Sequence, residues 1–174
     1  MKLGIVITNR NRPEPLSACL TSLAAQTVHT HWVCISDLGS SKIEARKLRG
    51  LAEEFAVSYL RIEHHEWNKG LAFNTTLKHM SPCSHVMQLD ADMLLHPGLL
   101  ATLQNDLRTN DCVVHVPRDI DPRQVGRLRY DGGVGGFTRL LGKSAPRGPY
   151  CVGGCATFPH QWLMDTGGID EAFV

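Results

Sequence analysis

The chain carries almost no net charge, since 18 Lys and Arg stand against 17 Asp and Glu and leave a formal balance of +1. This balance argues against a protein held to nucleic acid by charge, because such proteins normally carry a marked basic excess. Long apolar runs are absent too, and the run at residues 3–7 is too short for a signal-peptide core or a membrane span. We therefore expect a cytoplasmic protein with no transmembrane segment and no nucleic-acid partner.

Two glycine-rich phosphate-binding patterns are missing as well. No G-x-G-x-x-G follows the first apolar run, and no G-x-x-x-x-G-K-[ST] occurs in the chain, which disfavours a Rossmann dehydrogenase and a P-loop NTPase. The six cysteines are scattered, and without an export signal they favour free thiols over a disulfide framework. Only Cys151 and Cys155 lie close together, without a Cys/His pair at zinc-finger distance.

Apolar segments alternate with helical patterns along the chain. Residues 3–7 are typical of a buried parallel strand, and Pro13 opens a helix whose apolar residues recur at helical spacing. Further strands are expected at 32–35, 57–62, 85–89 and 112–116. Such alternation requires right-handed crossovers, so the predicted fold class is α/β with a mostly parallel central sheet flanked by helices.

Residues 117–149 interrupt this pattern with seven glycines, four prolines and a local charge of +4. The composition favours a long flexible loop, either a functional lid or a solvated excursion. We expect one domain over 1–174, in which 1–116 form one half, 117–149 form the loop and 150–174 begin a second half.

Polar side chains follow the expected strands where each strand ends, and in an open parallel sheet ligands bind at that edge. Asp90 and Asp92 follow the fourth strand and can divide two tasks, one holding a ribose hydroxyl and the other a divalent cation. Mg²⁺ and Mn²⁺ prefer such oxygen ligands together with substrate phosphates. The alternative is that both are turn-capping aspartates.

Arg10 and Arg12 lie between the first strand and the helix opened by Pro13. The helix dipole and the guanidinium fork both favour a diphosphate there. A solvated surface is the alternative for this pair. Together with the carboxylates, these arginines suit a phosphate-bearing ligand held with a metal.

Four segments in this order resemble the landmarks of GT-A glycosyltransferases of the inverting family 2 type: Ile5-Val-Ile-Thr-Asn-Arg-Asn-Arg-Pro13, Ser36-Asp-Leu-Gly-Ser40, Asn68-Lys-Gly70 with Asn74, and Leu89-Asp-Ala-Asp92. The Arg-Asn-Arg element, Gly153-Gly154 and residues 167–173 are also similar to family 7 galactosyltransferases and chondroitin-polymerase-type domains. The resemblance covers nearly the whole chain except 117–149.

The resemblance implies a metal-dependent transfer of a sugar, with inversion, from a nucleotide-diphosphate sugar to an acceptor hydroxyl. A UDP-sugar is the expected donor and Mn²⁺ or Mg²⁺ the expected cofactor, whereas the acceptor is not identified. Residues 1–116 would be the nucleotide-binding half, and 150–174 would begin the acceptor-side half. Asp92 would ligate the metal, Asp90 would face the ribose or sugar, Asp37 would contact the base or ribose, and Asn68 would lie beside the donor pocket. The remaining nucleotide-sugar-binding residues would be Thr8, Arg10, Arg12, Ala91, Gly153 and Gly154.

Two departures from the family pattern stand out. Leu38 occupies the place of the second Asp in the stretch after the second strand, which weakens that part of the base pocket. The general base of the family lies in a later segment, so we expect it beyond Val174 and the domain to be C-terminally incomplete. Asp170 and Glu171 would frame that segment.

Two other functions stay open. A sugar-nucleotide nucleotidyltransferase would use a related sheet, but it normally carries a glycine-rich loop after the first strand, where Thr8-Asn9 has no glycine. A domain that binds a nucleotide sugar without transferring it would keep the metal-binding aspartates and form no product.

Overall fold

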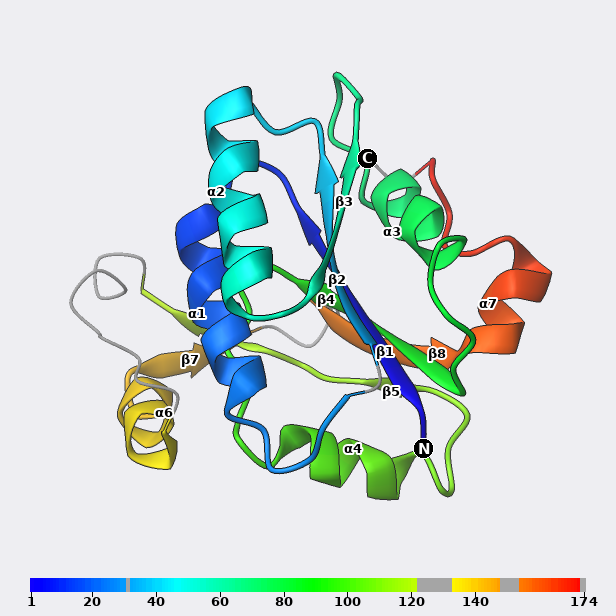
Figure 1. The fold of residues 1–174 in the computed structure, drawn as a ribbon. Coiled ribbons are helices and arrows are strands. Elements are labelled where there is room, and N and C mark those ends of the chain that lie inside the picture. Colours follow the sequence, from blue (N-terminus) through cyan, green and yellow to red (C-terminus); the bar gives the residue numbers. More distant parts are fainter. Residues whose placement is uncertain (31, 122–132, 148–153, 173–174) are drawn as a thin grey trace.

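The apolar run near the start of the chain forms the central strand of the computed structural model, which describes residues 1–30, 32–121, 133–147 and 154–172. This strand, β1 (Leu3–Asn9), is buried along its whole length. It pairs in parallel with β2 (Trp32–Leu38) and with β4 (His85–Asp90), and β3 (Ser58–Ile62) extends the parallel set beyond β2 (Figure 1). The predicted α/β class with parallel central strands is confirmed.

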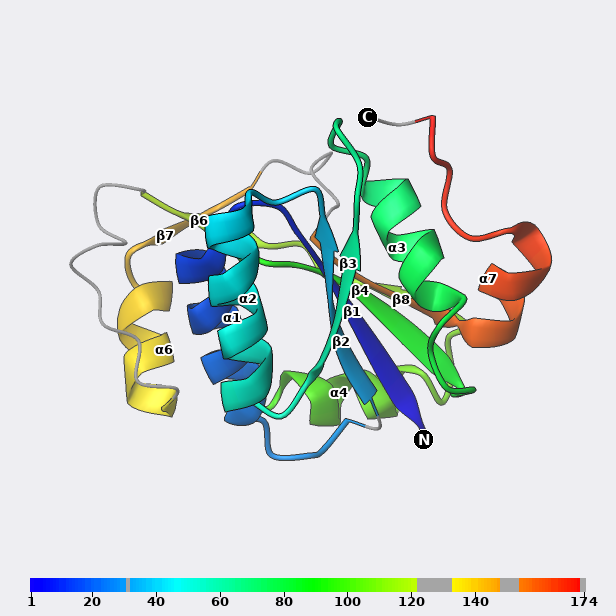
Figure 2. The same cartoon turned by 45° about the horizontal axis from the view of Figure 1, so that its top comes forward.

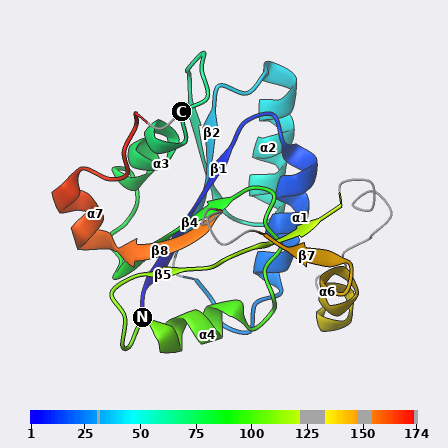
Figure 3. The same ribbon diagram turned by 180° about the vertical axis from the view of Figure 1, so that it is seen from behind.

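The sixth strand enters the sheet in a place that the sequence did not indicate. β8 (Cys155–Pro159) lies antiparallel between β4 and the short strand β5 (Val113–Val114), so the order is β3-β2-β1-β4-β8-β5 (Figure 3). Hydrophobic periodicity identifies a strand, such as the one expected at 112–116, but it does not identify the partners of that strand. The insertion brings the start of β8 beside the end of β4.

Helices cover both faces of the sheet. α1 (Pro13–Ala24) and α2 (Lys42–Glu54) lie on one face, and α3 (Lys69–Leu77) and α7 (His160–Thr166) on the other (Figure 1). Side chains alternate between the faces of a strand, so Ile5 and Ile7 of β1 join the core that contains α1, α2 and α4 (Leu99–Asp106). Val6 joins the second core, with Phe73 of α3.

Local sequence signals account for the helix starts. Pro13 occupies the first turn of α1, where its missing N–H costs no helical hydrogen bond. The Ser41 side chain accepts a hydrogen bond from the Glu44 backbone N–H at 3.2 Å and caps α2. Within the described residues, no helix is long and apolar enough to cross a bilayer.

The described part of residues 117–149 differs from the long loop expected there. It contains β6 (Arg118–Ile120), α6 (Val134–Leu141) and β7 (Ser144–Pro146), and the two strands pair antiparallel as a separate small sheet beside α1 (Figure 2). An ion pair of 2.6 Å joins Asp119 to Arg147 next to this sheet. Strands of three residues are too short to show a periodicity, which explains the difference. The predicted mobility of the segment stays a prediction.

Candidate functional site

A pocket of about 340 Å³ lies at the carboxyl ends of β1 and β4. The strands that follow β1 in sequence, β2 and β3, lie on one side of it, and β4 lies on the other side, so the pocket is at the switch point of the strand order. Its lining brings together six of the residues predicted from sequence: Thr8, Arg10, Arg12, Asp90, Ala91 and Asp92. Asn9, Trp67 and Lys69 complete it. A second hollow of about 310 Å³ is lined by residues such as Leu20, Phe55 and Val57, and its described lining contains no carboxylate, lysine or arginine. The charged side chains that the sequence singled out therefore gather in the first pocket.

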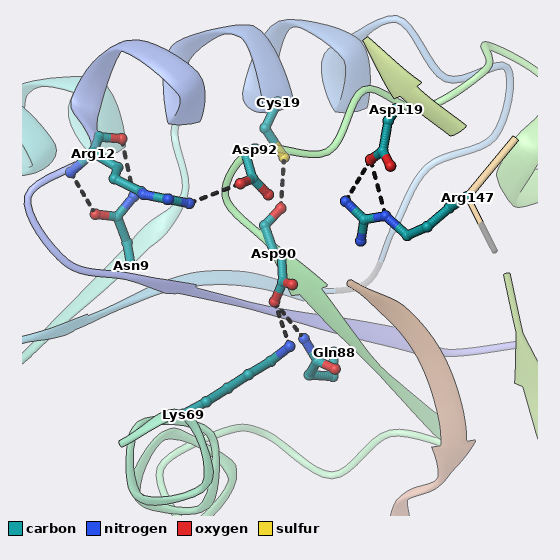
Figure 4. A network of polar contacts seen from close by, with 9 residues as sticks. All are labelled: Asn9, Arg12, Cys19, Lys69, Gln88, Asp90, Asp92, Asp119 and Arg147. Atoms are coloured by element: carbon teal, nitrogen blue, oxygen red, sulfur yellow. Dashed lines mark hydrogen bonds and ion pairs between the residues drawn. The ribbon is translucent and has the colours of Figure 1, made fainter. Parts of the chain in front are cut away.

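Asp92 forms an ion pair with Arg12 at the rim of this pocket. The Arg12 Nη1 atom lies 2.7 Å from Asp92 Oδ2, and the two side chains are 60% and 49% exposed (Figure 4). Asn9 fixes the turn that carries Arg12, because its Oδ1 accepts from the Arg12 backbone N–H at 3.2 Å and its Nδ2 donates to the Arg12 carbonyl at 3.1 Å. The sequence singled out Arg12 and Asp92 but missed the positioning role of Asn9, which is itself buried.

Asp90, at the end of β4, is paired with the cationic side chain of Lys69. Its Oδ1 forms an ion pair with Lys69 Nζ at 2.5 Å and accepts a hydrogen bond from Gln88 Nε2 at 3.0 Å (Figure 4). Its backbone N–H donates to the Gly154 carbonyl at 2.8 Å, which ties β4 to the residue before β8. Lys69 was visible in sequence as the middle residue of Asn68-Lys-Gly70, yet nothing in that motif shows that its amine reaches Asp90.

Thr8 adds an unpaired hydroxyl to the pocket. Its Oγ1 is buried and has no hydrogen-bond partner among the described residues, and its backbone is in register with Asp90. Buried hydroxyls are normally hydrogen-bonded, so this oxygen is a candidate partner for a polar ligand. Arg10, also in the lining, donates from Nη2 to the His65 carbonyl at 2.7 Å.

The predicted contact of Asp37 with a base or ribose stays a prediction, and in the structure its carboxylate is bound within the protein. Asp37 is fully buried and is absent from the pocket lining. Its carboxylate accepts from Tyr59 Oη at 2.6 Å and from the Ser40 backbone N–H at 3.2 Å. Burial, and then the bond to this carboxylate, raise the pKa of the Tyr59 hydroxyl. Asp37 thus holds the loop after β2 and binds Tyr59, a partner on another strand that sequence spacing cannot reveal.

Asn68 lies between two pocket residues in the sequence, but its own side chain forms hydrogen bonds within the protein. Its Oδ1 caps α3 by accepting from the Leu71 N–H at 2.7 Å, and its Nδ2 donates to the Glu171 carbonyl at 2.7 Å. Its neighbours Trp67 and Lys69 are the ones that line the pocket. Gly153 lies outside the described residues.

The donor set fits a divalent cation. Asp90 and Asp92 supply carboxylate oxygens in one pocket, and no group of three or more His, Cys, Asp or Glu that could hold a metal occurs among the described residues. Mg²⁺ and Mn²⁺ sites commonly combine one or two carboxylates with phosphate oxygens of the substrate. Two carboxylates with the side chains of Arg12 and Lys69 beside them suit that combination.

Replacing Gly154 with Ala should lower the free energy of unfolding by about 1–2 kcal/mol, the cost of a left-handed residue with a Cβ. Gly154 has a φ of +92°, and a Cβ would lie 3.0 Å from Met93 Sδ and 3.4 Å from Asp90 Oδ2. Chemical denaturation of Gly154→Ala measures the effect. The control is Gly50→Ala in α2, where a Cβ meets nothing within 4 Å; helix propensity predicts a gain of about 0.5–1 kcal/mol there. If both variants change stability equally and in the same direction, the left-handed conformation of Gly154 does not require a glycine.

Comparison with solved structures finds other proteins with the same fold. A mannosyltransferase from Pyrobaculum calidifontis, in complex with GDP-Man and Mn²⁺, superposes with a TM-score of 0.63 at 23% identity over 98% of this chain and 48% of that one. S. aureus TarS 1–349, also solved with UDP, gives 0.68 at 18% identity over 95% and 49%. The 4-diphosphocytidyl-2C-methyl-D-erythritol synthase of Anaerococcus prevotii gives 0.57 at 14% identity over 95% and 73%. At these identities the likeness shows the fold alone.

The chain spans about half the length of the first two proteins. No curated protein sequence matches it. The sequence profile described as Glycosyl transferase family 2 matches residues 4–167, which is nearly the whole chain. With the GT-A fold of its structural neighbours, this match assigns the chain: it belongs to glycosyl transferase family 2.

Proposed function

We propose that the chain binds a nucleotide-diphosphate sugar with a divalent cation and transfers the sugar to an acceptor hydroxyl with inversion. The observation that carries the proposal is the pocket at the ends of β1 and β4, which is lined by two carboxylates, each in an ion pair with a long cationic side chain: Asp92 with Arg12 and Asp90 with Lys69. Family membership and the nucleotide ligands of the two glycosyltransferases above support it. UDP is the donor nucleotide that we propose, with GDP as the comparison.

Residues of the pocket divide the donor between them. Arg10 and Arg12 are the proposed partners of the diphosphate, because guanidinium forks match phosphate oxygens. Asp92 would hold Mn²⁺ or Mg²⁺, and Asp90 would face the ribose or sugar. The unpaired hydroxyl of Thr8 would form a hydrogen bond with the nucleotide sugar. When bound, the metal supplies Lewis-acid neutralisation of the departing nucleoside diphosphate.

The acceptor side of the reaction needs a general base that deprotonates the acceptor hydroxyl. The two acidic residues near the end of the described chain are occupied in other ways: Glu171 Oε1 accepts from Asn74 Nδ2 at 2.9 Å, and Asp170 Oδ1 accepts from the Ala172 N–H at 2.8 Å. This agrees with their predicted framing role. The base expected after Val174 stays a prediction, as do the acceptor, the likeness to family 7 and the cytoplasmic location.

Calorimetric titration of the chain with UDP and with GDP, each with and without Mn²⁺, tests the proposal. We expect binding of one nucleotide that strengthens when Mn²⁺ is present, because the carboxylates and the diphosphate then share one cation. Release of that nucleotide from its sugar conjugates separates transfer or hydrolysis from mere binding. A chain that binds neither nucleotide in the presence of Mn²⁺ would contradict the function.

Arg10→Met should weaken UDP binding at least about tenfold, since a hydrogen bond to a charged group contributes about 1.5–3 kcal/mol. Uridine lacks the diphosphate and should bind the variant as it binds the wild type. Arg46→Met, an exposed position on α2, is the matched control and should leave both affinities unchanged. Equal losses for UDP and uridine would show that Arg10 does not bind phosphate.

A further inference from the structure

Each carboxylate of the pocket already holds a cation that the chain itself supplies. Arg12 Nη1 lies 2.7 Å from Asp92 Oδ2, and Lys69 Nζ lies 2.5 Å from Asp90 Oδ1 (Figure 4). The two cations come from different faces of the sheet, because Arg12 precedes α1 and Lys69 begins α3 (Figure 1). The four side chains together carry no net charge.

We propose that Arg12 and Lys69 exchange partners when the donor binds: both leave their carboxylates to the divalent cation and turn to the phosphate oxygens of the nucleotide. The inference rests on the proposed function. It makes Lys69 a diphosphate-binding residue. It also explains why a metal-binding pair of aspartates carries two ion pairs.

Once a ligand enters, the charges of the pocket balance again only when metal and diphosphate are both present. A divalent cation that enters alone takes over the negative charge of Asp90 and Asp92, and it leaves Arg12 and Lys69 without an anion in the same small pocket. A diphosphate that enters alone must compete with the carboxylates for the same two cations. With both ligands present, every charged group has a partner of opposite sign, so each ligand should strengthen the binding of the other.

The geometry allows the exchange at low cost. The side chains of Lys69 and Asp90 are 30% and 33% exposed, and those of Arg12 and Asp92 are more exposed still. Ion pairs this open to solvent are weak. Lys69 and Arg12 have long flexible stems, and Gln88 Nε2, 3.0 Å from Asp90 Oδ1, keeps this carboxylate oriented after Lys69 leaves.

Removing either cation should therefore change the two affinities in opposite directions. Lys69→Met and Arg12→Met should bind Mn²⁺ alone at least about fivefold tighter than wild type, since a positive charge beside the metal is gone. With saturating Mn²⁺, both should bind UDP at least about tenfold more weakly, since a charge-assisted hydrogen bond is lost. Electron paramagnetic resonance of free Mn²⁺ measures the first affinity, and calorimetry the second.

Matched controls are Lys2→Met, an exposed position before the opposite end of β1, and Arg46→Met on α2. Both remove one positive charge and should change neither affinity. Loss of both affinities in the pocket variants would indicate a structural role, and unchanged Mn²⁺ affinity would show that the cations do not compete with metal. Either outcome overturns the exchange, as does tighter Mn²⁺ binding with unchanged UDP affinity.

The proposed function fails separately, if the wild type binds neither UDP nor GDP with Mn²⁺ present. The Mn²⁺ titration still decides the first half of the exchange in that case. A gain in the two pocket variants supports competition between the internal cations and the metal, and no gain overturns it.

Discussion

Asp92→Asn should abolish the enhancement of UDP binding by Mn²⁺. The substitution removes one of the two carboxylates that the pocket offers to a cation and keeps the size of the side chain. Loss of one partner of a charged contact costs about 2–5 kcal/mol, so the Mn²⁺-dependent affinity should fall at least about thirtyfold. Calorimetry with and without Mn²⁺ gives the two affinities directly.

Binding without metal should survive in this variant, because Asp92→Asn also frees Arg12 from its ion pair. The UDP affinity in a chelator should equal or slightly exceed that of the wild type. Stability should change little, since Asp92 is 49% exposed and exposed ion pairs contribute about 0–1 kcal/mol. Asp111→Asn, exposed and outside the pocket lining, is the control. If Mn²⁺ strengthens UDP binding equally in Asp92→Asn and wild type, the metal assignment is wrong.

The parallel core of the fold could be predicted because local signals and burial agree there. The run at 3–7 is apolar on both faces, and β1 is buried on both faces. Pro13 and Ser41 mark helix starts through their own backbone and side-chain chemistry. Such signals need no knowledge of distant residues.

Pairings between distant segments could not be predicted in the same way. The antiparallel insertion of β8 between β4 and β5 depends on which edges remain open after the parallel strands have paired. β6 and β7 are three residues each, and they pair across a segment whose glycines and prolines dominate its composition. Composition described that segment as a loop because composition averages over such short elements.

The same division applies to the site. Residues at the ends of β1 and β4 were predicted as a group, because the carboxyl ends of neighbouring parallel strands must lie together. Asp37 also lies at the end of its strand, yet its carboxylate is buried and accepts a hydrogen bond from Tyr59 Oη. Lys69 has no strand end to mark it and reaches Asp90 through the length of its side chain. Strand ends are visible in sequence, whereas side-chain reach is not.

Asn74 shows that one residue of a motif can have a structural role while another residue of it, Lys69, lines the pocket. It belongs to the Asn68-Lys-Gly70 landmark, and its side chain is buried. Nδ2 donates to the Ile169 carbonyl at 2.8 Å and to Glu171 Oε1 at 2.9 Å, while Oδ1 accepts from the Ile169 N–H at 2.9 Å. The segment that follows α7 thus lies against α3 (Figure 1).

Two glycines make this contact possible. A Cβ on Gly70 would lie 2.7 Å from the Asp170 carbonyl oxygen, and a Cβ on Gly168 would lie 2.0 Å from Asn74 Oδ1. Gly168 also has a φ of +96°, a conformation that residues with a Cβ rarely adopt. Gly70 and Asn74 are four residues apart and so lie on one side of α3. Gly70 and Asn74 therefore form a docking face for residues 168–171.

Asn74→Ala should lower the free energy of unfolding by about 2–4 kcal/mol, because three hydrogen bonds are lost and backbone groups of Ile169 are left without partners. The Ile169 amide should also exchange its hydrogen faster, since its acceptor is removed. Denaturant unfolding and amide hydrogen exchange measure the two effects. Asn110→Ala removes an exposed asparagine whose side chain donates to the Asp106 carbonyl at 2.8 Å and to Thr109 Oγ1 at 3.2 Å. It should cost less than about 1 kcal/mol, because both hydrogen bonds are open to solvent. If both variants lose the same stability and Ile169 keeps its protection, α3 does not hold the segment after α7, and the motif needs another explanation.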